Sequence, residues 1–144
     1  MNIRLATDAD VNLLAWLDKG SDFSAHWNEI AWQETLAQPT CRVWCAELNG
    51  KTVGFIALRG VADQYEITNL AVEASCRRQK IGKQLIQHAL EHLPGGEVTL
   101  EVSVQNMPAI SLYEKCGFVC RGVRKQFYKD GSDAWIMGIR LGDG

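Results

Sequence analysis

Hydrophobic residues along the first 40 positions change from a strand-like to a helix-like spacing. Residues 2–6 alternate between polar and apolar side chains, which predicts a strand. Apolar residues then recur every three or four positions over 11–17, behind an acidic first turn at 7–10, which predicts a helix. A second helix is expected over 28–37, because its apolar residues are again spaced helically and Pro39 stands just beyond it as a stop.

Strand-like segments dominate the middle of the chain. Four of them are rich in β-branched and apolar residues, at 41–48, 52–59, 65–72 and 98–104. Asn49-Gly50 is a strong signal for a two-residue hairpin, so the first two segments should pair antiparallel. A helix over 79–92, followed by Pro94-Gly95-Gly96, separates the last two, and this strand–helix–strand succession predicts a right-handed parallel crossover.

The last third of the chain predicts a short helix and a terminal hairpin. Asn106 can cap a helix that has Pro108 in its first turn and Gly117 as its stop. Segments 118–128 and 133–141 should pair as a β-hairpin. The complete pattern predicts an α/β (α+β) fold, with a mixed central sheet of six to seven strands flanked by about four helices, in a single domain over 1–144.

Composition and charge exclude several classes of protein. A formal net charge of −2 argues against a dedicated nucleic-acid-binding protein, which would usually be basic. No apolar run reaches the length of a membrane span, and the first residues lack the layout of a signal peptide, so we expect a cytoplasmic protein. The five cysteines form no Cys-x-x-Cys pair, which indicates reduced thiols and neither a disulfide framework nor a metal site.

Four cations crowd the start of the predicted helix over 79–92, namely Arg77, Arg78, Lys80 and Lys83. The N-terminus of a helix is already positive, so cations are disfavoured there unless an anion binds. Free backbone N–H groups at a helix start bind phosphate, and several cations suit a polyphosphate. A solvated basic turn is the alternative that charge alone leaves open. A dinucleotide-binding turn is not indicated, because Gly82 is its only glycine.

The same region resembles the acetyl-coenzyme A motif of the GCN5-related N-acetyltransferases. Residues 69–72 read Asn-Leu-Ala-Val and 77–82 read Arg-Arg-Gln-Lys-Ile-Gly, against a family pattern of Gln or Arg, two residues, Gly, one residue, then Gly or Ala. Residues 106–118 are similar to the family's later signature of Asn, Ala, Leu-Tyr-Glu and Gly-Phe. The chain looks most like the RimI-type members, which acetylate the N-terminal alanine of a small-subunit ribosomal protein. Lys80 departs from the pattern's first glycine; it could crowd the pyrophosphate loop, or add a phosphate contact if the backbone there is already helical.

The resemblance extends over nearly the whole chain and implies acetyl-coenzyme A as cosubstrate. The strand backbone at 70–72 would pair with the pantetheine arm, and the N–H groups of 78–83 would surround the pyrophosphate. A backbone N–H near Leu70 would polarise the thioester carbonyl. The implied cofactor-binding residues are Leu70, Ala71, Val72, Arg77, Arg78, Gln79, Lys80, Ile81, Gly82, Lys83 and Asn106.

The resemblance also implies the residues that carry out the transfer, because Glu101 matches the family's general base and Tyr113 its general acid. A carboxylate can accept the amine proton directly or through water, and a phenol can donate a proton to the departing thiolate. From the residues alone, Glu101 would be interpreted as a solvent-facing strand residue and Tyr113 as a packing residue. Glu29, Glu66 and Tyr128 are candidates for the acceptor site.

A protein N-terminal α-amine is the expected acceptor. At pH 7, deprotonating an α-amine of pKa about 7.8 costs about 1 kcal/mol, whereas a lysine of pKa about 10.4 costs about 4 to 5 kcal/mol. Neither a nucleic acid nor a membrane is expected as a partner. Two alternatives stay open: the same fold acetylating a small-molecule amine, and a non-catalytic acyl-coenzyme A-binding module. The sequence does not indicate the oligomeric state.

Overall fold

A computed structural model describes residues 1–142, apart from the side chains of Arg78 and Gln79. These residues form one mixed sheet of seven strands, together with four α-helices and two 3-10 helices, which confirms the predicted fold class. In chain order the elements are β1 (Asn2–Leu5), η1 (Asp8–Asp10), α1 (Val11–Lys19), α2 (Glu29–Ala37), β2 (Cys41–Leu48), β3 (Lys51–Val61), β4 (Gln64–Val72), η2 (Ala74–Gln79), α3 (Ile81–Glu91), β5 (Gly96–Ser103), α4 (Met107–Lys115), β6 (Val119–Arg124) and β7 (Ala134–Leu141).

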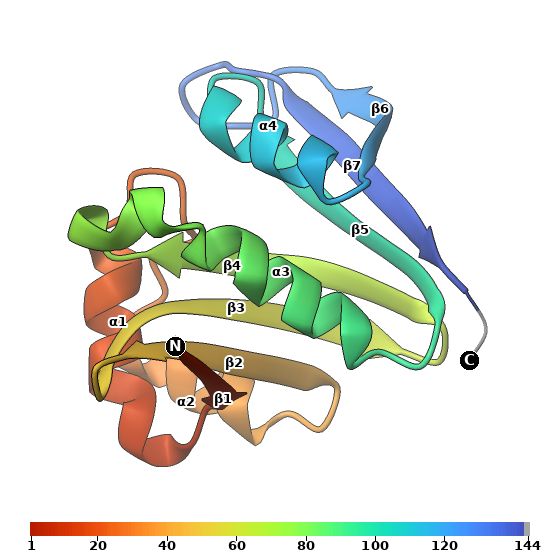
Figure 1. The fold of residues 1–144 in the computed structure, drawn as a ribbon. Helices are drawn as coiled ribbons and strands as arrows, with labels where there is room; N and C mark the ends of the chain where they lie inside the picture. The colour runs from red at the N-terminus through yellow and green to blue at the C-terminus, as the bar shows by residue number, and fades with distance from the viewer. Residues whose placement is uncertain (143–144) are drawn as a thin grey trace.

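The sheet has the strand order β1-β2-β3-β4-β5-β7-β6. Neighbouring strands are antiparallel except β4 and β5, which are parallel, as the predicted crossover requires. The parallel pairing joins only 64–66 to 97–99 among the described residues. The two strands therefore meet at one end and separate toward the other (Figure 1). We call the separated part, residues 67–72 of β4 and 100–103 of β5, the strand divergence.

A bulge in β4 coincides with the start of the strand divergence. The register against β3 shifts between Ala57 and Leu58, which leaves Thr68 as an extra residue in β4. A bulge bends its strand and increases the local twist. The extra residue also reverses the side of the sheet to which the odd-numbered side chains of β4 point. Ile67 packs in the core beneath α3 and α4, whereas Ala71 packs in the core beneath α1 and α2. The bulge thus turns the end of β4 away from the line of β5.

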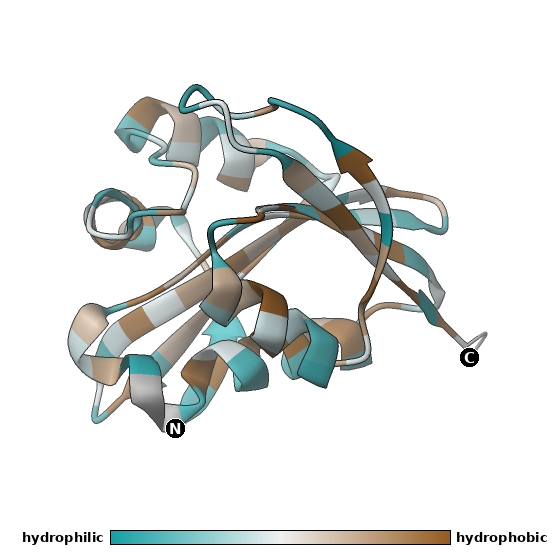
Figure 2. Cartoon of the chain, turned by 90° about the horizontal axis from the view of Figure 1, so that it is seen from above, coloured by the Kyte–Doolittle hydropathy of each residue, from teal (hydrophilic) through white to brown (hydrophobic). Residues whose placement is uncertain are grey.

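Helices cover both faces of the sheet (Figure 2). One core lies beneath α3 and α4 and includes Ile81, Leu85, Ile86, Ala89 and Tyr113. The other lies beneath α1 and α2 and includes Val11, Leu14, Leu17 and Trp32. No helix within residues 1–142 is both long enough and apolar enough to cross a membrane.

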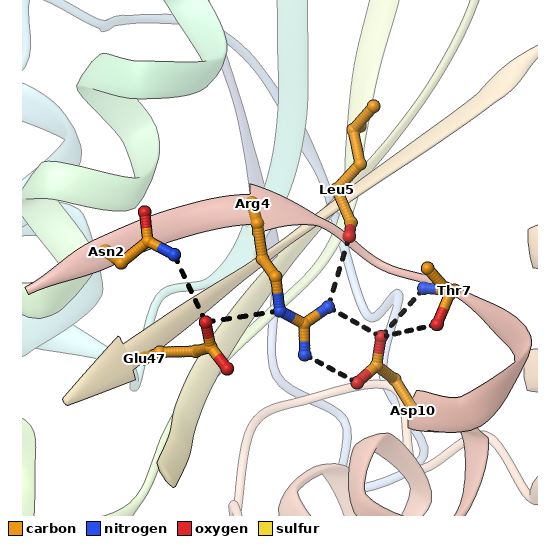
Figure 3. Close-up of polar contacts among 6 residues, drawn as sticks. All are labelled: Asn2, Arg4, Leu5, Thr7, Asp10 and Glu47. Carbon is orange, nitrogen blue, oxygen red and sulfur yellow. Dashed lines mark hydrogen bonds and ion pairs between the residues drawn. The ribbon is translucent and has the colours of Figure 1, made fainter. Parts of the chain in front are cut away.

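An ion pair fastens β1 to the start of α1 (Figure 3). The Arg4 guanidinium donates to both carboxylate oxygens of Asp10, at 2.8 Å each, and its Nε lies 3.3 Å from Glu47. Asp10 also accepts the backbone N–H of Thr7 at 2.7 Å. The Arg4 guanidinium holds the pKa of Asp10 below its usual value, and the Thr7 N–H lowers it further.

Two predicted boundaries are wrong next to a residue with a left-handed backbone conformation. The helix expected over 79–92 is α3, which begins only at Ile81, because Lys80 adopts a left-handed conformation (φ 61°, ψ 21°) that interrupts a right-handed helix. The strand expected over 118–128 ends at Arg124. The chain then forms a loop in which Gln126 has a φ of 52° and its N–H donates to Asp133 at 2.9 Å.

Candidate active site

The backbone of β4 presents hydrogen-bonding groups to the strand divergence. The Glu73 N–H donates to the Val53 carbonyl at 2.7 Å, and in an antiparallel pair every second residue points toward the same neighbour. Leu70 and Val72 therefore direct their N–H and C=O groups away from β3 and into the strand divergence. The carbonyl of Val72 confirms this direction, since it accepts a bond from Nε of Arg77 at 3.1 Å. The Leu70 N–H therefore points into the strand divergence.

The basic turn supplies free backbone donors next to this strand. The first i→i−4 hydrogen bond of α3 runs from Gln84 N to Lys80 O, at 3.1 Å, so the N–H groups of 81–83 precede it. Gly82 lies close to α4, because a Cβ added there would come within 3.2 Å of Leu112 Cδ2. A glycine here keeps the turn narrow and its N–H groups accessible, which fits a pyrophosphate. The predicted contacts by the side chains of Arg78 and Gln79 lie outside the described residues.

Lys80 joins η2 to α3. Its backbone conformation gives a physical reason for the glycine that the family pattern has at this position. Its φ of 61° lies in the left-handed region, which glycine enters without the clash of a Cβ. The backbone at Lys80 is therefore not helical, so the condition attached to the predicted phosphate contact is not met. The side chain itself is exposed.

The two candidate catalytic residues lie on opposite faces of the sheet. Val98, Leu100 and Val102 of β5 are buried beneath α3 and α4, so Glu101 faces the side that α1 and α2 cover. Tyr113 is buried on α4, on the opposite side. Within the strand divergence β4 and β5 no longer pair, so no continuous sheet separates the two faces there.

Glu101 lines a depression of about 480 Å³ on its face of the sheet. Its side chain is 25% exposed and pairs with Nε of Arg124 at 2.9 Å. Glu66 lines the same depression and pairs with Arg59 at 2.8 Å. The depression therefore carries two carboxylates, each held by a guanidinium. Glu29, by contrast, is exposed at the start of α2 and does not line this depression.

The Tyr113 phenol is held in its protonated form by its surroundings. Its ring packs edge to face against Phe118, with centroids 5.7 Å apart. Burial raises the pKa of Tyr113 well above the usual value for a phenol, and the neighbouring Cys116 and Tyr128 would raise it further in their ionised forms. The pKa of half-buried Tyr128 is raised by burial and then by the charge of Glu101.

Asn106 occupies the position that the sequence predicts for it at the start of α4. Its Oδ1 accepts the Ala109 N–H at 3.4 Å, so the side chain caps the helix. This capping fixes the first turn of α4, which is the helix that carries Tyr113.

Sequence reasoning missed several residues of this region. Arg124 pairs with Glu101 across an intervening strand, and such a contact depends on a register that no sequence motif reveals. Asp18 and Asn69 form a buried polar pair beside Leu70. A signal for Asp18 existed, because an acidic residue in the last turn of a predicted helix opposes the helix dipole.

Comparisons with known proteins agree with this architecture. The family model described as "Acetyltransferase (GNAT) family" matches residues 9–118. The N-alpha-acetyltransferase RimI of Mycobacterium tuberculosis is 31% identical over 122 residues, covering 81% of this chain and 77% of that protein. An N-alpha-acetyltransferase of Sulfolobus acidocaldarius is 30% identical over 155 residues, covering 96% and 92%.

A solved structure extends the likeness to the whole fold. The crystal structure of the ribosomal-protein-S18-alanine N-acetyltransferase from Escherichia coli superposes with a TM-score of 0.88 at 25% identity, covering 99% of this chain and 95% of that one. Enzymes of the GNAT family generally use acetyl-coenzyme A. The chain therefore belongs to the GNAT family of acetyltransferases and is an N-acetyltransferase.

Proposed function

We propose that this enzyme transfers the acetyl group of acetyl-coenzyme A directly to the α-amine at a protein N-terminus, as in the ribosomal-protein-alanine type. The observation that carries the proposal is the strand divergence, which has free N–H groups on β4, a buried phenol on one face and a carboxylate on the other. The names of the M. tuberculosis and E. coli relatives support a protein N-terminus as the acceptor. One continuous sheet carries both sides of this site, so we propose a single catalytic domain over 1–144.

The cofactor side of the proposed site consists mainly of backbone. The outward N–H and C=O groups of Leu70 and Val72, with Ala71 between them, would pair with the pantetheine arm. The N–H groups of the turn from Arg78 to Lys83 would bind the pyrophosphate, with Arg77 and Lys83 adding positive charge and Asn106 fixing the facing helix. The Leu70 N–H would polarise the thioester carbonyl, which makes its carbon more electrophilic.

One residue from each face of the sheet would carry out the proton transfers. Glu101 would remove a proton from the incoming amine, so that the amine nitrogen can bond to the acetyl carbon as the carbon–sulfur bond breaks. Tyr113 would donate its phenolic proton to the departing sulfur. Burial makes this phenol a weaker acid than free tyrosine, but the same burial would raise the pKa of a thiol beside it, so the two groups stay comparable.

A peptide-acetylation screen with a mass readout tests the proposal. A peptide that begins with alanine should gain one acetyl group, whereas the same peptide with a blocked N-terminus and an internal lysine should gain none. A polyamine and a free amino acid complete the panel, and acetylation of these instead of the peptide would favour the small-molecule alternative. Acetyl-coenzyme A binding without turnover on any acceptor would favour a non-catalytic module.

Glu101→Gln supplies the matched enzyme variant for this screen, because it keeps the shape of the side chain and removes the base. Turnover should fall about 100-fold at pH 7. The loss should be smaller at pH 9, where an α-amine is already neutral. Unchanged turnover at pH 7 would exclude Glu101 as the base.

A further inference from the structure

Asp18 is a buried carboxylate that the proposed chemistry does not use. It lies in the last turn of α1 and is 0% exposed. Its oxygens accept three hydrogen bonds, from His26 N at 2.7 Å, Trp27 N at 2.8 Å and Asn69 Nδ2 at 2.8 Å. No salt bridge reaches Asp18 within the described part of the chain. The charge is therefore stabilised by amide donors alone.

Asn69 completes the arrangement from the sheet. Its side chain donates to Asp18 and accepts the Ala25 N–H on Oδ1, at 3.1 Å. Three consecutive N–H groups, those of Ala25, His26 and Trp27, thus point at one buried carboxylate–amide pair. His26 has a φ of 59°, so the pair also holds a left-handed residue in the loop that joins α1 to α2. We call residues 21–28 the α1–α2 loop.

A group of this kind is costly at this place in the fold. A negative charge at the C-terminal end of a helix opposes the helix dipole, and a buried charge requires several hydrogen bonds to offset its desolvation. A leucine at position 18 would avoid both costs, but it could not accept the backbone N–H groups of His26 and Trp27 or the side-chain amide of Asn69. The pair therefore serves to fix the α1–α2 loop to β4 at one residue, Asn69.

The position of Asn69 connects this loop to the proposed chemistry. Asn69 follows the bulge at Thr68 and directly precedes Leu70, whose N–H points into the strand divergence. The α1–α2 loop lies on the face that α1 and α2 cover, which is also the face of Glu101. We infer that Asp18 and Asn69 are positioning residues for acetyl transfer, locking the acceptor-side loop and the Leu70 N–H into one rigid unit. This inference rests on the proposed function.

Isosteric exchange of the pair provides the test. Asp18→Asn removes the charge and places an amide group against donors, and Asn69→Asp places two carboxylates side by side. The double variant, Asp18→Asn with Asn69→Asp, again has one carboxylate and one amide. Each single variant should lower kcat/KM for the acceptor peptide about 10- to 100-fold, because small displacements of positioning groups are that costly. The double variant should have a kcat/KM about tenfold higher than that of the single variants.

Two measurements separate positioning from structural support. The carbonyl stretch of ¹³C-labelled acetyl-coenzyme A, measured by difference infrared spectroscopy, should shift to lower frequency on binding the wild type and shift less in each single variant. The Kd for acetyl-coenzyme A should stay within about threefold, because the N–H groups of the turn are untouched. Asp8→Asn is the matched control, since Asp8 is an exposed carboxylate on η1, outside the α1–α2 loop and the strand divergence, and should leave both readouts at wild-type values.

Single variants that fold with a wild-type carbonyl shift and wild-type kcat/KM would overturn the inference. A lower unfolding midpoint without these changes would likewise reduce the pair to a structural role. Asn69→Ala leaves Asp18 two of its three donors and replaces Asp18→Asn if that variant does not fold. If no acceptor is turned over, the proposed function fails while the infrared comparison still decides this inference. If the wild type does not bind acetyl-coenzyme A, both are overturned.

Discussion

Replacing Lys80 tests the basic turn in the most direct way. Its φ of 61° and ψ of 21° put an L-residue in the left-handed region, at a cost of roughly 1 to 2 kcal/mol that glycine lacks. Glycine makes the unfolded chain more flexible, which offsets roughly 0.4 to 1 kcal/mol. Lys80→Gly should therefore be about 0.5 to 1 kcal/mol more stable than Lys80→Ala. Both variants also remove a cation from the start of α3, which should add about 0.3 to 1 kcal/mol to the free energy of unfolding of each variant.

Urea unfolding at pH 7 measures this difference, because the alanine and glycine variants share the loss of charge and differ only in the Cβ methyl group that restricts the backbone. With a typical slope for a small protein, the midpoints should differ by about 0.4 M. A glycine variant that is no more stable than the alanine variant would refute the left-handed assignment at this residue. Titration of acetyl-coenzyme A into the same two variants then isolates the ammonium group. Weaker binding in both variants, most pronounced at low salt, would identify a phosphate contact.

Three further predictions concern other parts of the molecule. Tyr113→Phe should lower kcat with little change in the Kd for acetyl-coenzyme A, and full turnover in steady-state assays would exclude the acid role. Asp10→Asn should reduce the free energy of unfolding by about 2 kcal/mol at pH 7, because it breaks the paired bonds to Arg4. The folded-state pKa of Asp10 is lowered, so its contribution is present above pH 4 and lost as the pH falls further, and the gap between the two unfolding curves should close there. Burial and the charge of His92 lower the pKa of His88, so the wild type should lose stability as the pH falls below about 6.5. The His88→Gln variant should lose less stability over the same range. Parallel curves of unfolding free energy against pH would contradict this.

Local sequence signals predicted most of the fold because each element carries its own pattern. The strand over 41–48 was predicted at its observed bounds, and the Asn49-Gly50 turn has the positive φ angles that a two-residue hairpin requires. The errors occurred where a single residue adopts an unusual conformation. A lysine carries no signal for a left-handed φ, so the predicted start of α3 lies two residues early. Gln126 also has a left-handed φ that its residue type does not indicate, so the predicted end of β6 lies too late.

The candidate site divides in the same way between local and non-local information. Apart from Asn106, the proposed cofactor contacts come from one continuous segment, 70–83, and mainly from its backbone, so a short motif is enough to indicate them. The proposed acceptor side comes from separate segments: Glu66 on β4, Glu101 on β5, Arg124 on β6 and the α1–α2 loop. The proximity of Glu66, Glu101 and Arg124 depends on the bulge at Thr68 and on the register of three strands, which the hydrophobic pattern does not encode. Acceptor specificity can therefore change through register and loop contacts while the cofactor motif stays the same.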